Sequence, residues 1–220
     1  VLSLKSDGGI EAEIIFGEKN VVSYPKPTAL LRMIIESFRL SDGDIVLDFF
    51  AGSGTTAHAV WQLNTKYLRS IRHILVQLPE ALHLEMKEQK TAAKFCDKLG
   101  APRTIAEITK ERLRRAGQKI REENPLFSGD VGFRVFKLDT SNLRAWDPDR
   151  GDLEGTLAAS VEHVKEGRTE GDLLFELLLK LGLELTVPMT RREIAGKTVH
   201  SIGADRKSTR LNSSHRTVSR

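Results

Sequence analysis

The hydrophobic and polar positions of this chain follow their clearest pattern between residues 41 and 80. An unbroken apolar run from Ile45 to Phe50 is typical of a buried parallel strand, and a glycine-containing turn follows it. A helix is expected to open near Thr55, and a second apolar run from Ile71 to Leu78 predicts another strand. Strand, turn, helix and strand make a βαβ unit, so we expect two neighbouring parallel strands joined by a right-handed crossover.

The N-terminal region predicts one strand and one helix. Residues 8–23 contain the alternating run IEAEIIFG between turn-forming sequences, which indicates a short strand. The following stretch, YPKPTALLRMIIESF, predicts a proline-bracketed loop and then a helix, with Thr28 in the N-cap position and apolar residues at helical spacing.

The second half of the chain is expected to be mainly helical. Residues 87–124 predict helix with one apolar stripe, made of Ile105, Ile108, Leu113, Ala116 and Ile120. Acidic residues are interleaved with its basic ones, which favours a solvated helix face over a nucleic-acid patch; the basic residues are Lys110, Arg112, Arg114, Arg115, Lys119 and Arg121. Residues 132–146 alternate as a late strand, and residues 171–185 predict a strongly apolar helix.

The net charge of +4 comes entirely from the last sixteen residues. This segment carries five basic residues against Asp205, so the remaining chain has 29 basic and 29 acidic residues and is neutral. Its sequence DRKSTRLNSSH matches the in-frame translation of a common sequencing-library adapter, so residues 205–220 are interpreted as an artefactual, disordered tail. The alternative is a natural basic, serine-rich terminus. Its basic charge therefore does not indicate a nucleic-acid partner.

The composition, with 40% hydrophobic and 29% charged residues, describes an ordinary globular chain. No apolar run is long enough to span a bilayer, and the first residues show no secretory signal, so we expect no membrane partner. The single cysteine, Cys96, is interpreted as a small core residue. One cysteine cannot form an intramolecular disulfide, which fits a reducing compartment, so we expect a cytoplasmic location. We expect no metal site, because the histidines are widely spaced: His58, His73, His83, His163 and His200.

The turn after the first predicted strand combines a carboxylate with very small residues. Asp48 ends the strand, and glycines in the next six residues allow a ligand to approach the backbone closely. The turn lacks the lysine and the spacing of a phosphate-binding loop, and the last glycine of the dinucleotide motif is replaced by Ala57. The carboxylate of Asp48 would repel a pyrophosphate but attract an ammonium. Free amides at the start of a helix would donate hydrogen bonds to a carboxylate. A zwitterionic amino-acid head group, such as that of S-adenosylmethionine, fits this pairing.

VLDFFAGSGTTAHAV resembles the cofactor motif of DNA amino-methyltransferases, and YPKPTALLRMII resembles the element that precedes it in their circularly permuted class. Further blocks, RHILVQLPE, TIAEITKERLRRA, GFRVFKLDTSN, LLFELLLKLG and IAGKTVHSI, are similar to the modification subunit of type III restriction-modification systems. The resemblance covers residues 8–202 and implies a partial α/β, Rossmann-like core that depends on S-adenosylmethionine, with a C-terminal α+β extension.

The resemblance also implies site residues. The methionine part of the cofactor would be lined by Asp48, Phe49, Ala51, Gly52, Ser53, Gly54 and Thr55. Lys26 and Pro27 would close over the same end. The ribose hydroxyls would be held by Gln77, where such proteins usually have an acid, or by Glu80, which can alternatively be a helix-start carboxylate.

The family's catalytic loop, Asp-Pro-Pro-Tyr or close to it, has no counterpart before the turn, so no catalytic residue is assigned. WDPDR at residues 146–150 comes after the cofactor motif, lacks the second proline and the aromatic residue, and is interpreted as a turn. We therefore expect a C-terminal fragment that is inactive alone. Its expected parts are residues 1–100, the cofactor-binding half of the methyltransferase domain, and residues 101–204, the extension.

The resemblance implies that the intact protein methylates adenine N6 in double-stranded DNA, as a homodimer of modification subunits together with a restriction subunit. Two alternatives stay open. The chain can be a non-catalytic assembly module that binds the restriction subunit through its second half, a hypothesis motivated by the apolar helix at 173–185. It can also be a methyltransferase for RNA or small molecules.

Overall fold

The computed structural model describes residues 8–144, 151–152 and 164–203. The chain divides into two compact units, residues 1–133 and 134–220, which we describe separately. The boundary predicted at residue 100 stays a prediction, and the first compact unit extends beyond it.

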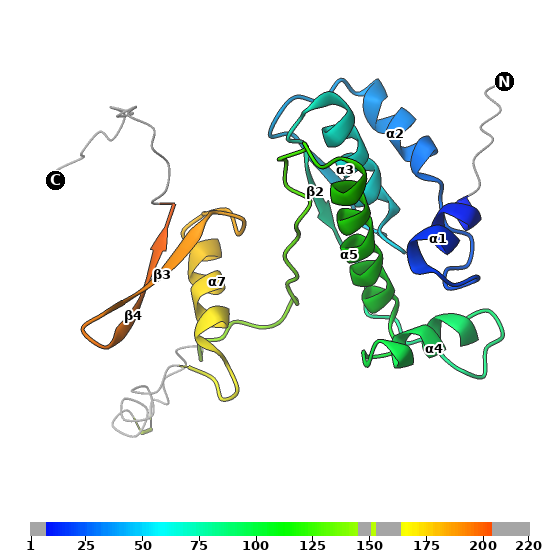
Figure 1. The fold of residues 1–220 in the computed structure, drawn as a ribbon. Coiled ribbons are helices and arrows are strands. Elements are labelled where there is room, and N and C mark those ends of the chain that lie inside the picture. The colour runs from blue at the N-terminus through cyan, green and yellow to red at the C-terminus, as the bar shows by residue number, and fades with distance from the viewer. Residues whose placement is uncertain (1–7, 145–150, 153–163, 204–220) are drawn as a thin grey trace. The chain divides into compact units, whose positions relative to one another are not determined.

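The first unit contains the predicted βαβ arrangement (Figure 1). Strand β1 (Ile45–Asp48) is followed by helix α3 (Thr55–Tyr67) and strand β2 (Arg72–Leu75). The strands pair in parallel, from Ile45 opposite Arg72 to Asp48 opposite Leu75, which confirms the predicted neighbours. The Asn64 side chain fixes the entry to β2, since its amide nitrogen donates to the Ile71 carbonyl and its oxygen accepts from the Ile71 amide.

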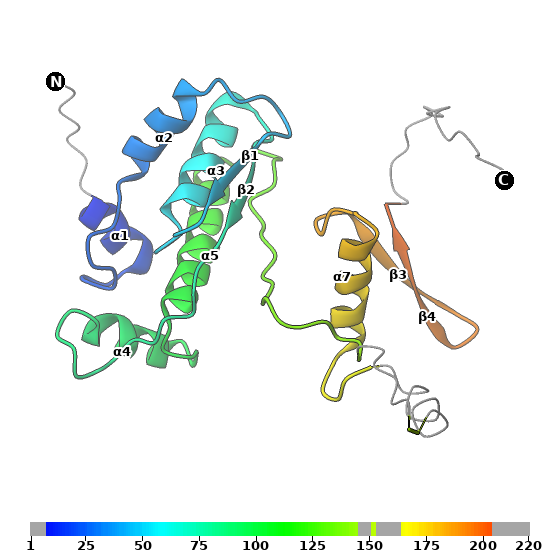
Figure 2. The same cartoon turned by 180° about the vertical axis from the view of Figure 1, so that it is seen from behind.

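Helices pack on one face of this two-stranded sheet, and the other face is open. In Figure 2 the strands lie in front of α3. The expectation of a buried strand was therefore wrong for one side of β1. Apolar side chains on the open face are 45–64% exposed: Ile45, Leu47, Phe49, Ile74, Val76 and Leu78. Their neighbours in the alternation, such as Val46 and Leu75, pack toward the helices.

Residues 8–16 form helix α1 (Gly8–Phe16), so the strand predicted in this region was wrong. The sequence fits both periods, because Ile10, Ala12 and Ile14 alternate while Ala12, Ile15 and Phe16 follow helical spacing. Packing selects the helix: the second set is buried, and the Phe16 ring stands edge-on to Phe95 with centroids 5.4 Å apart.

Helix α2 (Thr28–Ser37) confirms the predicted helix, although Pro27 rather than Thr28 is its N-cap. The free amide of Thr28 donates instead to Glu11 Oε2 at 2.9 Å, so a carboxylate from α1 satisfies the start of α2.

The predicted helical region 87–124 divides into α4 (Lys90–Lys98) and α5 (Ile105–Glu123). The break between them contains Gly100, which has a φ of +63°, and Pro102. The predicted stripe of α5 packs on α1, α3 and α4, with four of its five residues buried. Cys96 lies fully buried beside it, as predicted, and burial raises the pKa of its thiol.

The second unit contains helix α7 (Glu170–Lys180) and an antiparallel hairpin of β3 (Met189–Ile194) and β4 (Lys197–Ile202). Ala195 and Gly196 form the two-residue turn with φ values of +53° and +72°, as the twist of a tight hairpin requires.

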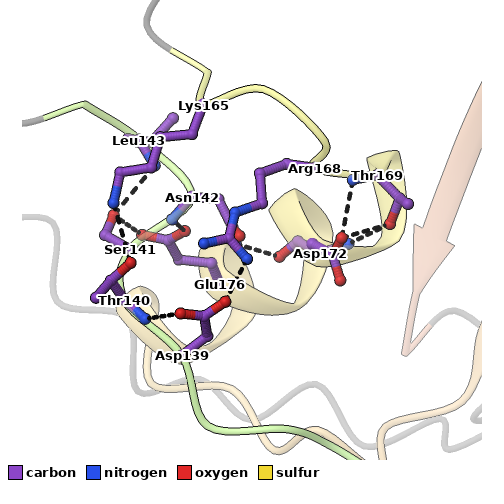
Figure 3. A network of polar contacts seen from close by, with 10 residues as sticks. All are labelled: Asp139, Thr140, Ser141, Asn142, Leu143, Lys165, Arg168, Thr169, Asp172 and Glu176. Carbon is purple, nitrogen blue, oxygen red and sulfur yellow. Dashed lines mark hydrogen bonds and ion pairs between the residues drawn. The ribbon is translucent and has the colours of Figure 1, made fainter.

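Residues 132–144 contain no strand, so the late strand predicted at 132–146 was wrong for this part of it; Ala145 and Trp146 lie outside the described residues. Polar contacts with α7 occupy this segment instead (Figure 3). Glu176 accepts from Ser141 Oγ at 2.5 Å and from the Asn142 amide at 2.7 Å. Arg168 pairs with Asp139 at 2.6 Å, just before the capping box that opens α7.

The packing of α1 yields a first prediction. Phe16→Ala should lower the free energy of unfolding by about 3–5 kcal/mol, because Phe16 is 2% exposed. Ile14→Ala should change it by less than about 0.5 kcal/mol, because Ile14 is 60% exposed. Urea unfolding of the two variants measures both. Equal losses would contradict the helix, since residues 14 and 16 share a face only in a strand.

The contacts of Glu176 yield a second prediction. Hydrogen bonds from Lys180, Ser141 and Asn142 lower the pKa of its carboxyl from 4.5 to about 2. A lowered pKa means that the carboxylate stabilises the second unit above about pH 4.5, and that this contribution is lost as the pH falls toward 2.

Glu176→Gln should remove that part of the pH dependence. The measurement is the amide exchange protection of α7 between pH 5 and pH 2, with wild type and Glu176→Gln compared at each pH. Parallel pH profiles for the two proteins would refute the role of this carboxylate.

Candidate functional site

The turn between β1 and α3 forms the site that the sequence predicts. Gly52 and Gly54 both have left-handed backbones, with φ values of +52° and +80°. Gly54 is the N-cap of α3, and no side chain caps this helix. The first amides of α3 therefore remain without side-chain partners and carry the positive end of the helix dipole.

Asp48 lies at the carboxyl end of β1, where the turn begins. Its Oδ1 accepts from the Phe50 amide at 3.0 Å, and its Oδ2 accepts from Thr56 Oγ1 at 2.5 Å. Thr56 belongs to the first turn of α3, so the carboxylate connects the strand to the helix that follows it. These two bonds place a negative charge at the entrance of the turn in a fixed orientation.

Two buried hydroxyls of the same turn contact helix α5. Ser53 Oγ and Thr55 Oγ1 are 3.4 Å apart, and both accept from Nη1 of Arg112 in α5, at 2.7 and 2.8 Å. Arg112 is fully buried, and burial lowers its pKa to about 10, so the guanidinium stays charged at neutral pH.

The expected solvated face of α5 was wrong at Arg112. This residue lies in register with the apolar stripe, four residues after Ile108 and four before Ala116. An arginine at a stripe position is the sequence signal that could have revealed its burial.

Helix α5 also packs directly behind the glycines. Thr109 Oγ1 lies 2.5 Å from the Gly52 carbonyl oxygen, to which it donates. A Cβ atom on Gly54 would lie 3.1 Å from Thr109 Cγ2 and 3.4 Å from Leu113 Cδ2. Gly54 is therefore required both by its backbone angle and by the close approach of α5.

The two residues predicted to hold a ribose occupy different surroundings. The Gln77 carboxamide oxygen accepts from the Gly52 amide at 2.7 Å, and its nitrogen donates to the Leu78 carbonyl. Gln77 thus ties the loop after β2 to the glycine turn. Glu80 is exposed, and its main-chain carbonyl accepts from the Ile105 amide at the start of α5.

The remaining predicted site residues are less closely tied to the turn. Lys26 is exposed in the loop before α2, and in the described part of the chain no hydrogen bond joins it or Pro27 to the turn. Phe49 is 64% exposed on the open sheet face, whereas Ala51 is buried.

Positive charge surrounds the first turns of α3. His58 is buried there, and burial, assisted by the charges of Arg112, Lys119 and Arg32, lowers its pKa to about 3. The imidazole is therefore neutral at physiological pH, and its Nε2 contacts Gln62 at 3.2 Å. The carboxylate of Asp48 and this positive potential lie near the same turn, and a site with both charges suits a zwitterionic ligand.

No three histidine, cysteine, aspartate or glutamate side chains among the described residues are grouped to hold a metal ion. No helix in the same ranges is long and apolar enough to cross a membrane. The WDPDR stretch at 146–150, interpreted as a turn, lies outside the described residues.

Comparison with known proteins gives a consistent match. The model of a DNA methylase family matches residues 11–74. The Mod subunit of the type III restriction-modification enzyme StyLTI from Salmonella typhimurium is 43% identical over 141 residues, which are 64% of this chain and 20% of that protein.

Two further relatives have the same description. The EcoP15I Mod subunit of Escherichia coli is 44% identical over 102 residues, 46% of this chain and 13% of that protein. The EcoPI Mod subunit of Escherichia phage P1 is 29% identical over 181 residues, 80% of this chain and 25% of that protein. The chain spans between an eighth and a quarter of the length of these relatives. With its DNA methylase segment and these matches, the chain is a relative of the modification subunits of type III restriction-modification systems.

Proposed function

We propose that the chain supplies the donor-binding part of a DNA adenine-N6 methyltransferase, the site-specific modification subunit of a type III restriction-modification system. The observation that carries this proposal is the turn between β1 and α3, where the fixed carboxylate of Asp48 lies beside the uncapped start of α3. The match to a DNA methylase family favours DNA over RNA or a small molecule as the methyl acceptor.

The residues of the turn fit S-adenosylmethionine. Asp48 would accept hydrogen bonds from the ammonium of its amino-acid end, and the amides of Ser53 and Thr55 would donate to its carboxylate, while the Gly54 amide donates to the Ala51 carbonyl. When bound, S-adenosylmethionine would supply a methyl group from its sulfonium, leaving a neutral thioether. Adenine N6 would accept the methyl group and lose a proton.

The other predicted contacts are part of the same proposal. Phe49, Ala51 and Gly52 would line the methionine moiety, and Lys26 and Pro27 would close over it. Either Gln77 or Glu80 would hold the ribose. The exposed carboxylate of Glu80 is the freer group, because both polar atoms of the Gln77 side chain already form hydrogen bonds.

For the intact protein we propose a Rossmann-like core, a homodimer of modification subunits, double-stranded DNA as substrate, association with a restriction subunit and a cytoplasmic location. Each of these rests on the likeness to the relatives, whose names describe Mod subunits of type III restriction-modification enzymes.

A second candidate function, assembly with the restriction subunit, is favoured by α7. The sequence predicts that the leucines of this helix pack on another element, yet Leu178 is the one that is buried. Leu177 and Leu181 lie four residues apart, on one face at the end of the helix, and are 55% and 65% exposed. An apolar surface of this kind is typical of a contact with another protein.

The donor-binding proposal predicts the effect of Asp48→Asn in the intact modification subunit. The substitution removes the charge but keeps the size, so the affinity for S-adenosylmethionine should fall about 10- to 100-fold through loss of a charged hydrogen bond. Isothermal titration calorimetry measures the change.

Asp44→Asn is the matched control, because Asp44 precedes the same strand and accepts from the Ser41 amide outside the turn. Unchanged donor affinity in Asp48→Asn would eliminate the proposed site.

The assembly candidate predicts the effect of a double substitution, Leu177→Ser with Leu181→Ser, on one face of α7. The affinity of the modification subunit for the purified restriction subunit should fall at least about tenfold, because the serine side chains bury less apolar surface at the interface than the leucines do. Donor affinity should not change. Biolayer interferometry measures the affinity for the restriction subunit. If the double variant binds the restriction subunit as tightly as wild type does, α7 is not the contact.

A further inference from the structure

Arg112 is the one fully buried cation among the described residues, and its location requires a physical explanation. It forms no ion pair in the described part of the chain, and its Nε and Nη2 atoms have no hydrogen-bond partner there. Glu11 acts on its charge, but Oε2 of Glu11 already accepts from the Thr28 amide. A buried charge without a bonded counterion is unfavourable unless an anion approaches it.

The surroundings of Arg112 increase this need. Its Nη1 lies against Ser53 and Thr55, at the positive end of the α3 dipole, so two positive potentials coincide. His58 is held neutral in the same region, and Lys119 and Arg32 add further positive charge. The site therefore favours an anion at the turn more strongly than a helix start alone would.

The two hydroxyls connect Arg112 to the surface of the turn. A hydroxyl that accepts from a guanidinium directs its own proton away from it and becomes a stronger donor. Ser53 and Thr55 each accept from Arg112 and lie 3.4 Å from one another, so one can donate to the other and the second can offer its proton to a ligand at the turn.

We propose that Arg112 is a positioning residue that selects the carboxylate of the methyl donor, acting through the hydroxyls of Ser53 and Thr55. This inference rests on the proposed function and adds a specific role for α5. Arg112 orients the groups that hold the carboxylate and does not touch the reacting atoms. Thr109, which donates to the Gly52 carbonyl, keeps the same turn against α5.

The test compares two ligands that differ in one group. S-adenosylmethionine carries the carboxylate, and decarboxylated S-adenosylmethionine lacks it but keeps the amine, the sulfonium and the nucleoside. Their dissociation constants are measured by calorimetry on the intact modification subunit, for wild type, Arg112→Met and Arg112→Lys.

Wild type should prefer the carboxylate-bearing donor. Arg112→Met should weaken S-adenosylmethionine about 10- to 100-fold, as expected for a charge-assisted hydrogen bond, and should change the decarboxylated ligand by less than about twofold. Arg112→Lys should restore part of the selectivity. Arg114→Met is the control, because the Arg114 side chain is 57% exposed on the same helix and should change neither affinity.

A merely structural role for Arg112 would weaken both ligands equally, and that result would overturn the inference while leaving the proposed function intact. Binding of neither ligand to wild type would instead reject the proposed function, and the inference with it.

Circular dichroism establishes whether Arg112→Met folds. If Arg112→Met does not fold, the double variant Ser53→Ala with Thr55→Val tests the proposal instead, because it keeps Arg112 but removes both hydroxyls. It should lose the same selectivity for the carboxylate, and retained selectivity would refute the proposal.

Discussion

The site depends on the contact between the buried guanidinium of Arg112 and the turn that joins β1 to α3. Two hydrogen bonds, to Ser53 and Thr55, connect residues that are almost sixty positions apart. Since a buried cation needs its donors directed at acceptors, this contact sets the position of α5 relative to α3. Thr109 and Leu113 then approach the turn so closely that only glycine fits at position 54.

The same contact divides the charge of the turn. Asp48 presents a carboxylate at the end of β1, held by Phe50 and Thr56, while the start of α3 lies over Arg112. Opposite potentials a few residues apart orient a ligand that carries both an ammonium and a carboxylate. On the open face of the β1–β2 sheet, only Phe49 borders the turn among the exposed apolar side chains named above, and the others point away from the helices that hold the turn.

Residues with ambiguous periodicity show where sequence reasoning failed. The run around Ala12 fits an alternating strand and a helix equally well, and the packing of Phe16 on Phe95 decides for the helix. Residues 132–144 alternate in polarity, yet contacts with Glu176 and Arg168 take the place of a neighbouring strand. The β3–β4 hairpin was missed because Ala-Gly is a weak turn signal compared with Asn-Gly or Asp-Gly.

Local sequence alone determined the βαβ unit, the start of α3 at Thr55 and the carboxylate before the turn, because apolar runs and glycines act over a few residues. Tertiary structure decided which side chains lie behind the turn. From the sequence, Arg112 is predicted to be a solvent-exposed residue of a helix, but in the structure it contacts Ser53. Likewise, the sequence gives no partner for the Gln77 side chain, which accepts a hydrogen bond from the Gly52 amide. The register of Arg112 with the apolar stripe could indicate its burial, but its partners and those of Gln77 are distant in sequence, so no local pattern could assign the pairing.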